Sequence, residues 1–453
     1  MAERIEKNIL EFGGCGDGQF DNSNAFAAAF EALKGTCGGT LRVDAGVWRT
    51  GPIELFSNTT FLLEEGAIIS FIPEIERYRP VLTRWEGIEC YAMKPLVFAD
   101  GQENIVINGK GVFDGSGYVW WAVLKEKRKR GQKSPETELE KELARLNPGY
   151  EHQPSGGGSR EMQFLRPAFM QFRHCSNILL EGFTLRNSPF WTLHPLFCSD
   201  VTIRGLTISN PQDAPNTDGI DIDSCYEVLV EECEVTVGDD GIVIKSGSGE
   251  DGIRVNKPSE NIRVRNCTVK NGHGGIVIGS ETAAGIFNVT TEDCLFKGTD
   301  RGIRIKTRRG RGGEIRSLRF CRLTMEDNLC PIAINMFYRC GANFSEELFG
   351  LDIMPVVSTT PSIKNISIEH VRSSGCRASA GLVAGLPESP IEDLVITDCE
   401  FSTNEDDPAS PDESDMFWGL PTVTSKSFRV LNVKNPKFSN VRIYGPKETF
   451  IYG

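Results

Sequence analysis

A cluster of acidic and basic residues accompanies one repeated phrase in this sequence. At intervals of 22, 34 and 27 residues the phrase Gly-Ile-x-Ile recurs, beginning at Gly219, Gly241, Gly275 and Gly302. Asp218 and Asp240 directly precede the first two glycines, and Asp239 and His273 stand one position further back in the second and third copies. Carboxyl groups beside an imidazole are suited to acid–base chemistry, in which one group donates a proton and another accepts one.

The aspartates of this cluster match the needs of acetal cleavage. That reaction normally uses two carboxyl groups, an acid for the leaving oxygen and a base or nucleophile on the opposite side. Asp218, Asp239 and Asp240 could supply them. Like-charge repulsion should raise the pKa of at least one, so that a protonated acid persists near neutral pH. An aspartate at a strand end can also simply bond backbone amides, but three of them beside His273 favour catalysis.

A cationic segment follows in the fourth copy of the phrase. Residues 301–311 contain six Arg and Lys residues and no acid. Alternation along a strand places Arg304 and Lys306 on one face, and Lys245 occupies the position of Lys306 in the second copy. Guanidinium groups bind carboxylates bidentately, so this segment indicates an acidic sugar as substrate. We interpret the remaining cations as a solvated edge that deters strand pairing, namely Arg308, Arg309 and Arg311.

The repeat intervals predict the elements that position these residues. Periods of this size are typical of a solenoid, in which equivalent positions stack in columns about 4.8 Å apart. Residues 24–33 combine strong helix formers with one apolar face and predict a capping helix. Elsewhere a polar corner residue followed by alternating apolar positions predicts strand after strand, at Asn104, Asn177, Asp200, Glu227, Asn261, Asn288, Asn365, Asp393 and Asn440.

The chain is therefore expected to form one all-β domain over residues 1–453, a parallel β-helix with an N-terminal cap at about 10–35 and C-terminal coils and cap at about 400–453. Residues 116–165 interrupt the pattern and contain a basic run at 125–130. Ser134-Pro135 predicts the start of a short helix there, and the excursion could close one end of a substrate groove. Residues 404–415 are acidic and contain proline, which predicts a solvated loop.

Composition excludes several classes of function. The 62 Asp and Glu residues outnumber 49 Lys and Arg, and a net charge of −13 argues against nucleic acid as partner. No apolar run is long enough for a membrane span, so no membrane partner is expected. The first residues do not resemble a signal peptide, which predicts a cytoplasmic protein unless a signal has been removed.

The cysteines follow the coil repeat. Intervals of 34, 27 and 27 residues separate Cys233, Cys267, Cys294 and Cys321. One small apolar slot per coil explains this spacing, and free buried thiols fit a reducing compartment. No Cys-x-x-Cys pair occurs among the 14 cysteines, so neither a zinc site nor any other metal or cofactor is expected.

At these residues the chain resembles the polygalacturonases, glycoside hydrolase family 28. The motifs of that family occur in order, as Asn216-Thr217-Asp218, Gly238-Asp239-Asp240, Gly272-His273-Gly274 and Arg304-Ile305-Lys306. The resemblance implies a right-handed β-helix that hydrolyses α-1,4 bonds between galacturonate units with inversion. Gly241 departs from the cysteine common at that position of the family, for which we expect only a packing change.

The resemblance also implies roles for single residues. Asp239 is similar to the general acid, Asp218 and Asp240 to the pair that activates water, and His273 to the residue that tunes the acid. Arg304 and Lys306 are similar to the pair that binds the sugar carboxylate, and we add Asn216 and Lys245 as substrate-binding candidates. Column spacing by itself suggests the close carboxyl pair of a retaining enzyme, and side-chain direction is expected to widen it to the about 6.5–9.5 Å of inversion.

Several alternatives stay open. A pectate lyase would use the same fold and substrate but would cleave by β-elimination with calcium. A non-catalytic glycan-binding solenoid would present stacking aromatics, and Trp191 and His194 could form such a platform or a packed corner. Among hydrolases, exo action on oligogalacturonides is favoured because the 116–165 excursion can close the groove. A galacturonidase acting on rhamnogalacturonan fragments is the second choice.

Overall fold

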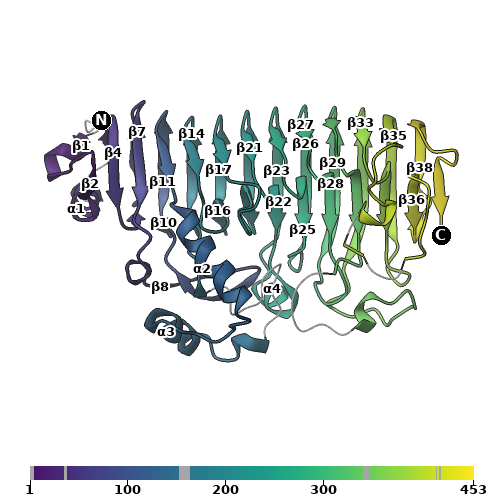
Figure 1. The fold of residues 1–453 in the computed structure, drawn as a ribbon, viewed down its shortest axis with the longest axis horizontal. Helices are drawn as coiled ribbons and strands as arrows, with labels where there is room; N and C mark the ends of the chain where they lie inside the picture. The colour runs from purple at the N-terminus through teal and green to yellow at the C-terminus, as the bar shows by residue number, and fades with distance from the viewer. Residues whose placement is uncertain (1–4, 35–37, 153–163, 340–345, 415, 418–419) are drawn as a thin grey trace.

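The protein is a right-handed parallel β-helix with few helices, as predicted (Figure 1). The computed structural model describes residues 5–34, 38–152, 164–339, 346–414, 416–417 and 420–453. Within these residues the coils stack as a 25-stranded and a 12-stranded sheet, and a separate hairpin pairs β8 (Pro80–Trp85) with β9 (Ile88–Met93). No helix among the described residues is long and apolar enough to cross a membrane.

The larger sheet contains two columns of parallel strands that meet in β35. One column runs through β1 (Ile5–Asn8), β3 (Gly39–Val43), β6 (Thr59–Leu63), β11 (Glu103–Gly109), β14 (Ser176–Glu181), β17 (Ser199–Arg204), β20 (Tyr226–Glu231), β23 (Ser259–Arg265), β26 (Ile286–Glu292), β29 (Glu314–Cys321), β32 (Ser362–Glu369), β35 (Ile391–Thr403) and β38 (Lys437–Tyr444). The other runs through β2 (Asp17–Asp21), β4 (Gly46–Thr50), β7 (Ala67–Phe71), β12 (Val112–Asp114), β15 (Thr184–Arg186), β18 (Thr207–Ser209), β21 (Glu234–Thr236), β24 (Thr268–Lys270), β27 (Leu295–Lys297), β30 (Thr324–Glu326) and β33 (Arg372–Cys376).

The smaller sheet carries the repeated phrase. Its strands are β5 (Ile53–Glu54), β10 (Val97–Asp100), β13 (Met170–Arg173), β16 (Leu193–Leu196), β19 (Ile220–Asp223), β22 (Asp240–Lys245), β25 (Gly274–Gly279), β28 (Arg301–Lys306), β31 (Cys330–Asn335), β34 (Gly381–Ala384), β36 (Phe428–Leu431) and β39 (Phe450–Tyr452). Parallel pairing aligns one isoleucine from each copy of the phrase in a single buried column, Ile220, Ile242, Ile276 and Ile303. The predicted stacking of the four copies is confirmed.

The predicted cysteine slot is present for three of the four cysteines. Cys233, Cys267 and Cys294 directly precede β21, β24 and β27, which pair in register, so these three side chains occupy equivalent positions. The prediction was wrong for Cys321, which ends β29 and lies opposite Glu292. Leu323 takes the equivalent position, because this coil is longer than the cysteine interval. All four side chains are buried and all four thiols are free. The sulfurs therefore act as small apolar core groups.

The polar corner residues adopt an unusual backbone conformation. All nine predicted corners have φ between 51° and 58°, a region that Asn and Asp tolerate better than most residues. Their side chains also connect neighbouring coils. The Asn104 amide donates to Asn58 Oδ1 at 2.7 Å, and the Asn177 amide donates to Asn104 Oδ1 at the same distance. Stacking of equivalent corners therefore explains the recurrence of these residues.

The capping helix α1 (Ser23–Lys34) lies at the N-terminal end of the stack, as predicted (Figure 1). Phe26 and Phe30 pack edge-on against Phe61, with ring centroids 6.0 and 5.3 Å apart. These contacts cover the apolar interior that the first coil would otherwise expose.

Three further helices and the β8–β9 hairpin gather along one side of the stack (Figure 1). They are α2 (Gly117–Lys129), α3 (Glu138–Leu146) and α4 (Gly249–Val255). Helix α2, which contains most of the basic run, was not predicted. The predicted start of α3 at Ser134 was wrong, because Thr137 caps the helix and exchanges hydrogen bonds with Glu140. Residues 153–163 of the predicted insertion lie outside the described residues.

Candidate active site

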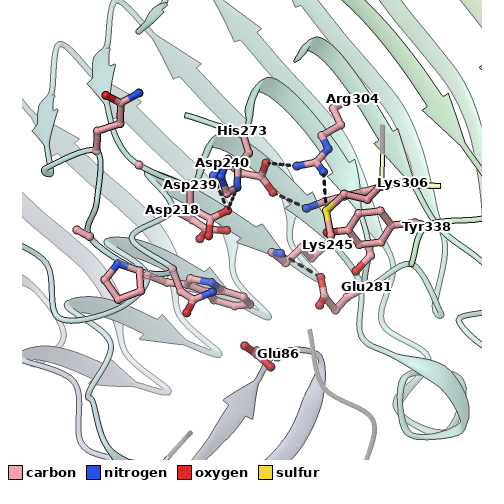
Figure 2. Close-up of a pocket in the computed structure, with 18 of the residues that line it drawn as sticks. Glu86, Asp218, Asp239, Asp240, Lys245, His273, Glu281, Arg304, Lys306 and Tyr338 are labelled. Carbon is pink, nitrogen blue, oxygen red and sulfur yellow. Dashed lines mark hydrogen bonds and ion pairs between the residues drawn. The ribbon is translucent and has the colours of Figure 1, made fainter. Parts of the chain in front are cut away.

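Strands β19, β22, β25 and β28 bring the predicted residues to one pocket of about 360 Å³ (Figure 2). Alternation along each strand turns the isoleucines into the core and the polar side chains toward the pocket. All eight sequence-predicted site residues line it, together with groups that the sequence did not indicate. The lining comprises Glu86, Arg128, Trp191, Gln212, Asp213, Ala214, Pro215, Asn216, Asp218, Gly238, Asp239, Asp240, Lys245, His273, Ser280, Glu281, Arg304, Lys306, Tyr338 and Met416.

Three carboxylates form the centre of the pocket. One oxygen from each of Asp218, Asp239 and Asp240 lies within 4.8 Å of the others. Asp218 and Asp240 are buried, whereas the Asp239 side chain is 19% exposed. These oxygens are closer than the about 6.5–9.5 Å usual between the carboxyl groups of an inverting enzyme. The limit concerns one oxygen of each group, so the expected widening by side-chain direction stays a prediction. The spacing would also let the three oxygens surround a cation, and the expected independence of metal stays a prediction.

Asp239 faces the pocket beside an imidazole. Its Oδ1 accepts the Asp240 backbone N–H at 2.9 Å and lies 3.2 Å from His273 Nδ1. This hydrogen bond to Asp239 is the main reason that the pKa of His273 is raised. The imidazolium form, a proton reservoir beside Asp239, therefore persists to a higher pH than in free histidine.

Asp240 is held in its ionised form. Burial alone would raise its pKa, but Lys306 Nζ lies 2.5 Å from Oδ2 and Arg304 Nη1 lies 3.0 Å from Oδ1. The two cations lower the Asp240 pKa far below its usual range. Arg304 and Lys306 are themselves buried, so in this structure they neutralise Asp240. A sugar carboxylate would have to share these cations with it.

Asp218 has the opposite electrostatic environment. Burial raises its pKa well above the usual value, and the neighbouring Asp239 charge raises it further. The Asp218 pKa is thus shifted in the predicted direction, but burial is a larger cause than like-charge repulsion. Asp239 and Asp240 lie beside cationic or imidazole partners, whereas Asp218 has no ion pair among the residues described.

Lys245 belongs to a buried layer beneath the aspartates. Its Nζ lies 3.0 Å from Glu281 and 3.6 Å from Asp221, and 4.5 Å from the centre of the Trp191 ring. Burial lowers the Lys245 pKa, but the attraction of Glu281 and Asp221 outweighs it and the pKa is raised. The repeat pattern did not indicate Glu281. Its only signal is its place two residues after the end of β25, the strand that pairs with β28.

Asn216 is held by an arginine from the end of the insertion. Arg166 donates to Asn216 Oδ1 at 2.9 Å and to the carbonyl oxygens of Pro215 and Pro189 at 2.5 and 3.0 Å. The guanidinium is buried over the ring of Phe190, 4.9 Å from its centre. Arg166 therefore fixes the loop before β19 that carries Asn216 and Asp218.

Trp191 and His194 do not form one sugar platform. Trp191 lines the pocket, but only 4% of it is exposed because it stacks on Phe190. His194 is buried outside the pocket, 2.8 Å from Gln171 and 3.6 Å from Asp223. The packed-corner interpretation is correct for His194. Trp191 exposes only a small part of its side chain to the pocket.

The solvated edge predicted for the end of the cationic segment was wrong. Arg308, Arg309 and Arg311 are buried, with 4% or less of each exposed. Arg309 binds both oxygens of Glu388, at 2.6 and 2.8 Å, and donates to backbone carbonyl oxygens. Alternation within a strand no longer applies there, because β28 ends at Lys306.

The acidic loop predicted at 404–415 is largely exposed over residues 404–414, as predicted, and residue 415 lies outside the described residues. Arg301 donates to the Glu413 and Ser414 carbonyl oxygens at 2.9 and 2.8 Å, and Ser414 is buried. Lys426 Nζ donates to the carbonyl oxygens of Asn404 and Asp407. Backbone carbonyls therefore anchor the loop together with two ion pairs, Arg377–Asp407 at 3.0 Å and Arg429–Asp412 at 3.3 Å. Sequence composition could not reveal these partners.

A groove with clustered carboxyl groups on a parallel β-helix fits the general requirement of glycoside hydrolases for paired carboxyls. The sequence profile of glycosyl hydrolases family 28 matches residues 149–405, more than half of the chain, and the protein belongs to this family. A probable polygalacturonase from Vitis vinifera is 31% identical over 329 residues, 70% of this chain and 60% of that protein. A probable polygalacturonase from Arabidopsis thaliana is 31% identical over 74% of this chain and 61% of its own.

The chain thus spans about three fifths of the length of these two relatives. Among solved structures, a hyperthermoactive exopolygalacturonase from Thermotoga maritima superposes with a TM-score of 0.77 at 35% identity, covering 89% of this chain and 88% of that one. A family 28 exopolygalacturonase from Yersinia enterocolitica has a TM-score of 0.74 over 100% of this chain and 77% of its own, at 20% identity. The latter likeness concerns the fold alone.

Proposed function

We propose that the protein hydrolyses α-1,4-galacturonosyl bonds in oligogalacturonides and acts from a chain end. The observation that carries the proposal is the arrangement of Asp218, Asp239 and Asp240 beside Arg304 and Lys306 in one pocket. Acid–base groups for acetal cleavage and cations for a uronate are thereby within reach of one bound sugar. Relatives named polygalacturonase support the same substrate class.

The electrostatics suggest a division of labour. Asp240 is kept ionised by Lys306 and Arg304, so it is available to orient an attacking water and accept its proton, although the same cations weaken it as a base. Asp239 is the more accessible carboxyl and lies beside His273, which could return its proton. In the proposed mechanism Asp239 protonates the leaving oxygen while Asp240, with Asp218, positions and activates the attacking water.

Leaving-group ability tests the assignment of the acid. An aryl galacturonide with an acidic phenol needs little protonation as it departs. Asp239→Asn should therefore retain much of the wild-type rate on this substrate while losing activity on oligogalacturonides. Asp240→Asn should lose both activities. If Asp218→Asn instead spares the aryl substrate, Asp218 is the acid, consistent with its raised pKa.

We further propose inversion. This proposal rests on the family resemblance alone, since aspartate oxygens within 4.8 Å of one another do not favour inversion over a retaining pair. Proton NMR of the first product formed from a galacturonate oligomer separates the two outcomes. A β-anomer appearing first supports inversion, and an α-anomer refutes it.

Support for exo action comes from the elements around the pocket. The hairpin β8–β9 contributes Glu86 and the insertion contributes Arg128, both at the pocket, and the Thermotoga maritima exopolygalacturonase covers nearly the whole chain. Products from a defined galacturonate series test the proposal. Stepwise release of one short product supports it, and an early spread of lengths contradicts it. A product that absorbs in the ultraviolet would indicate a lyase instead.

A further inference from the structure

Arg128 is the least explained cation of the pocket. It lies in the last turn of α2, is exposed, and lines the pocket with the catalytic aspartates. Neighbouring cations of the basic run are paired: Lys125 with Asp213 at 2.8 Å, Lys127 with Glu140 at 2.7 Å, and Arg130 with Glu136. The Arg128 side chain makes no ion pair or hydrogen bond within the part of the chain that the structure describes.

The other Lys and Arg residues of the pocket are already compensated. Lys245 pairs with Glu281, and Arg304 and Lys306 both pair with Asp240. An acidic substrate entering the pocket can therefore bind the Arg128 guanidinium without first displacing a protein carboxylate from it. Because guanidinium binds carboxylate bidentately and keeps its charge at any working pH, this arrangement favours binding of an acid group.

Arg128 lies apart from Arg304 and Lys306, the predicted carboxylate-binding pair. The Lys125–Asp213 ion pair ties α2 to the loop before β19, and Asp213 and Asn216 of that loop line the same pocket. Arg304 and Lys306 lie on β28, with β22 and β25 between. The two cationic places thus lie in different coils of the stack.

We propose that Arg128 binds the carboxylate of a second galacturonate unit, held on the β19 side of the catalytic aspartates. This inference rests on the proposed function. Its consequence is that the enzyme distinguishes oligomers that carry an acid group on both sides of the scissile bond from those that carry one.

A structural role for Arg128 has a matched control. Cations in the last turn of a helix stabilise its C-terminus, and Lys129 shares that turn with Arg128. Lys129 is exposed, does not line the pocket and makes no ion pair among the described residues. Arg128→Gln and Lys129→Gln remove the same charge from the same turn, so only pocket binding separates them.

The kinetic test uses galacturonate trimer and two analogues, each with one terminal galacturonate replaced by galactose. Arg128→Gln should lower kcat/KM on the trimer about tenfold or more, the usual loss for a charge-assisted hydrogen bond. One analogue should be a similarly poor substrate of the unmutated enzyme, and Arg128→Gln should cleave that analogue no worse than the unmutated enzyme does. Lys129→Gln should match the unmutated enzyme throughout.

Equal behaviour of the two variants would overturn the proposal, as would an equal loss by Arg128→Gln on all three substrates. Calorimetric binding of the trimer to the same three proteins, each also carrying Asp239→Asn to prevent cleavage, tests the contact without turnover. A Kd raised about tenfold only by Arg128→Gln supports it, and an unchanged Kd refutes it. Failure of the proposed function is recognised separately, because the unmutated enzyme would then bind the trimer without cleaving it.

Discussion

Removing the Arg309 guanidinium should destabilise the protein without changing its chemistry. Arg309 and Glu388 bind each other at 2.6 and 2.8 Å, with 4% and 3% of their side chains exposed. Arg309 also donates to the Leu348, Gly350 and Asp352 carbonyl oxygens. Arg309→Ala leaves the Glu388 carboxylate buried beside unpaired carbonyls.

Breaking a buried pair on one side costs about 3–5 kcal/mol, a large part of the about 5–15 kcal/mol by which proteins are usually stable. An exposed pair provides the control. Arg316 and Glu314 lie 3.3 Å apart with 37% and 34% of their side chains exposed, so Arg316→Ala should cost at most about 1 kcal/mol. Replacing both Arg309 and Glu388 by Met should recover most of the loss, since no charge is then buried.

The effect should depend on pH in a defined direction. Burial alone would raise the Glu388 pKa, but the hydrogen bond and charge of Arg309 lower it. A lowered carboxyl pKa contributes stability above the unfolded value of about 4.3, and that contribution is lost as the pH falls through the folded value. In Arg309→Ala the Glu388 pKa rises, so the variant takes up a proton sooner and its deficit should shrink in acid.

Urea unfolding at pH 7 and at pH 4 measures these differences, and kcat/KM per folded enzyme measures the chemistry. Similar losses in Arg309→Ala and Arg316→Ala would refute the buried-pair reasoning. A deficit that grows in acid would refute the linkage argument. A large fall in kcat/KM of fully folded Arg309→Ala would show that this side chain acts on the substrate after all.

The remaining predictions concern the pocket. Asp239→Asn should lower kcat on oligogalacturonides about 10²- to 10⁴-fold while calorimetry shows binding retained; equal activity would exclude the acid role. Lys306→Met should lower kcat through Asp240, and if Lys306 also holds the sugar carboxylate, KM should rise for free acids but not for methyl esters. Hydrogen bonding to Asp239 raises the His273 pKa above the ordinary value of 6.5. The fall of kcat/KM at alkaline pH should therefore occur at a higher pH than a free histidine would give, and it should shift or disappear in His273→Gln. Chelators should leave activity unchanged, whereas dependence on calcium would favour a lyase.

Local repetition carried most of what the sequence determined. Recurrence of Gly-Ile-x-Ile, of the cysteines and of the polar corners defined the solenoid, because each coil must fill the same positions against its neighbours. Coils of similar length then place residues near one phrase side by side, which is why the spacing of Asp218, Asp239, Asp240 and His273 was enough to group them. The family motifs added their expected roles and the substrate class.

Only the tertiary structure decided which charges meet. Arg304 and Lys306 neutralise Asp240 from positions 64 and 66 residues away, Glu281 reaches Lys245 across 36 residues, and Arg309 finds Glu388 across 79. Residue types predict that a cation can bind a carboxylate, but the choice between a protein and a sugar carboxylate depends on burial and distance. Glu86 and Arg128 could not be predicted as pocket residues for the same reason. The β8–β9 hairpin and α2 lie outside the repeat and reach the pocket through tertiary contacts that no local sequence pattern indicates.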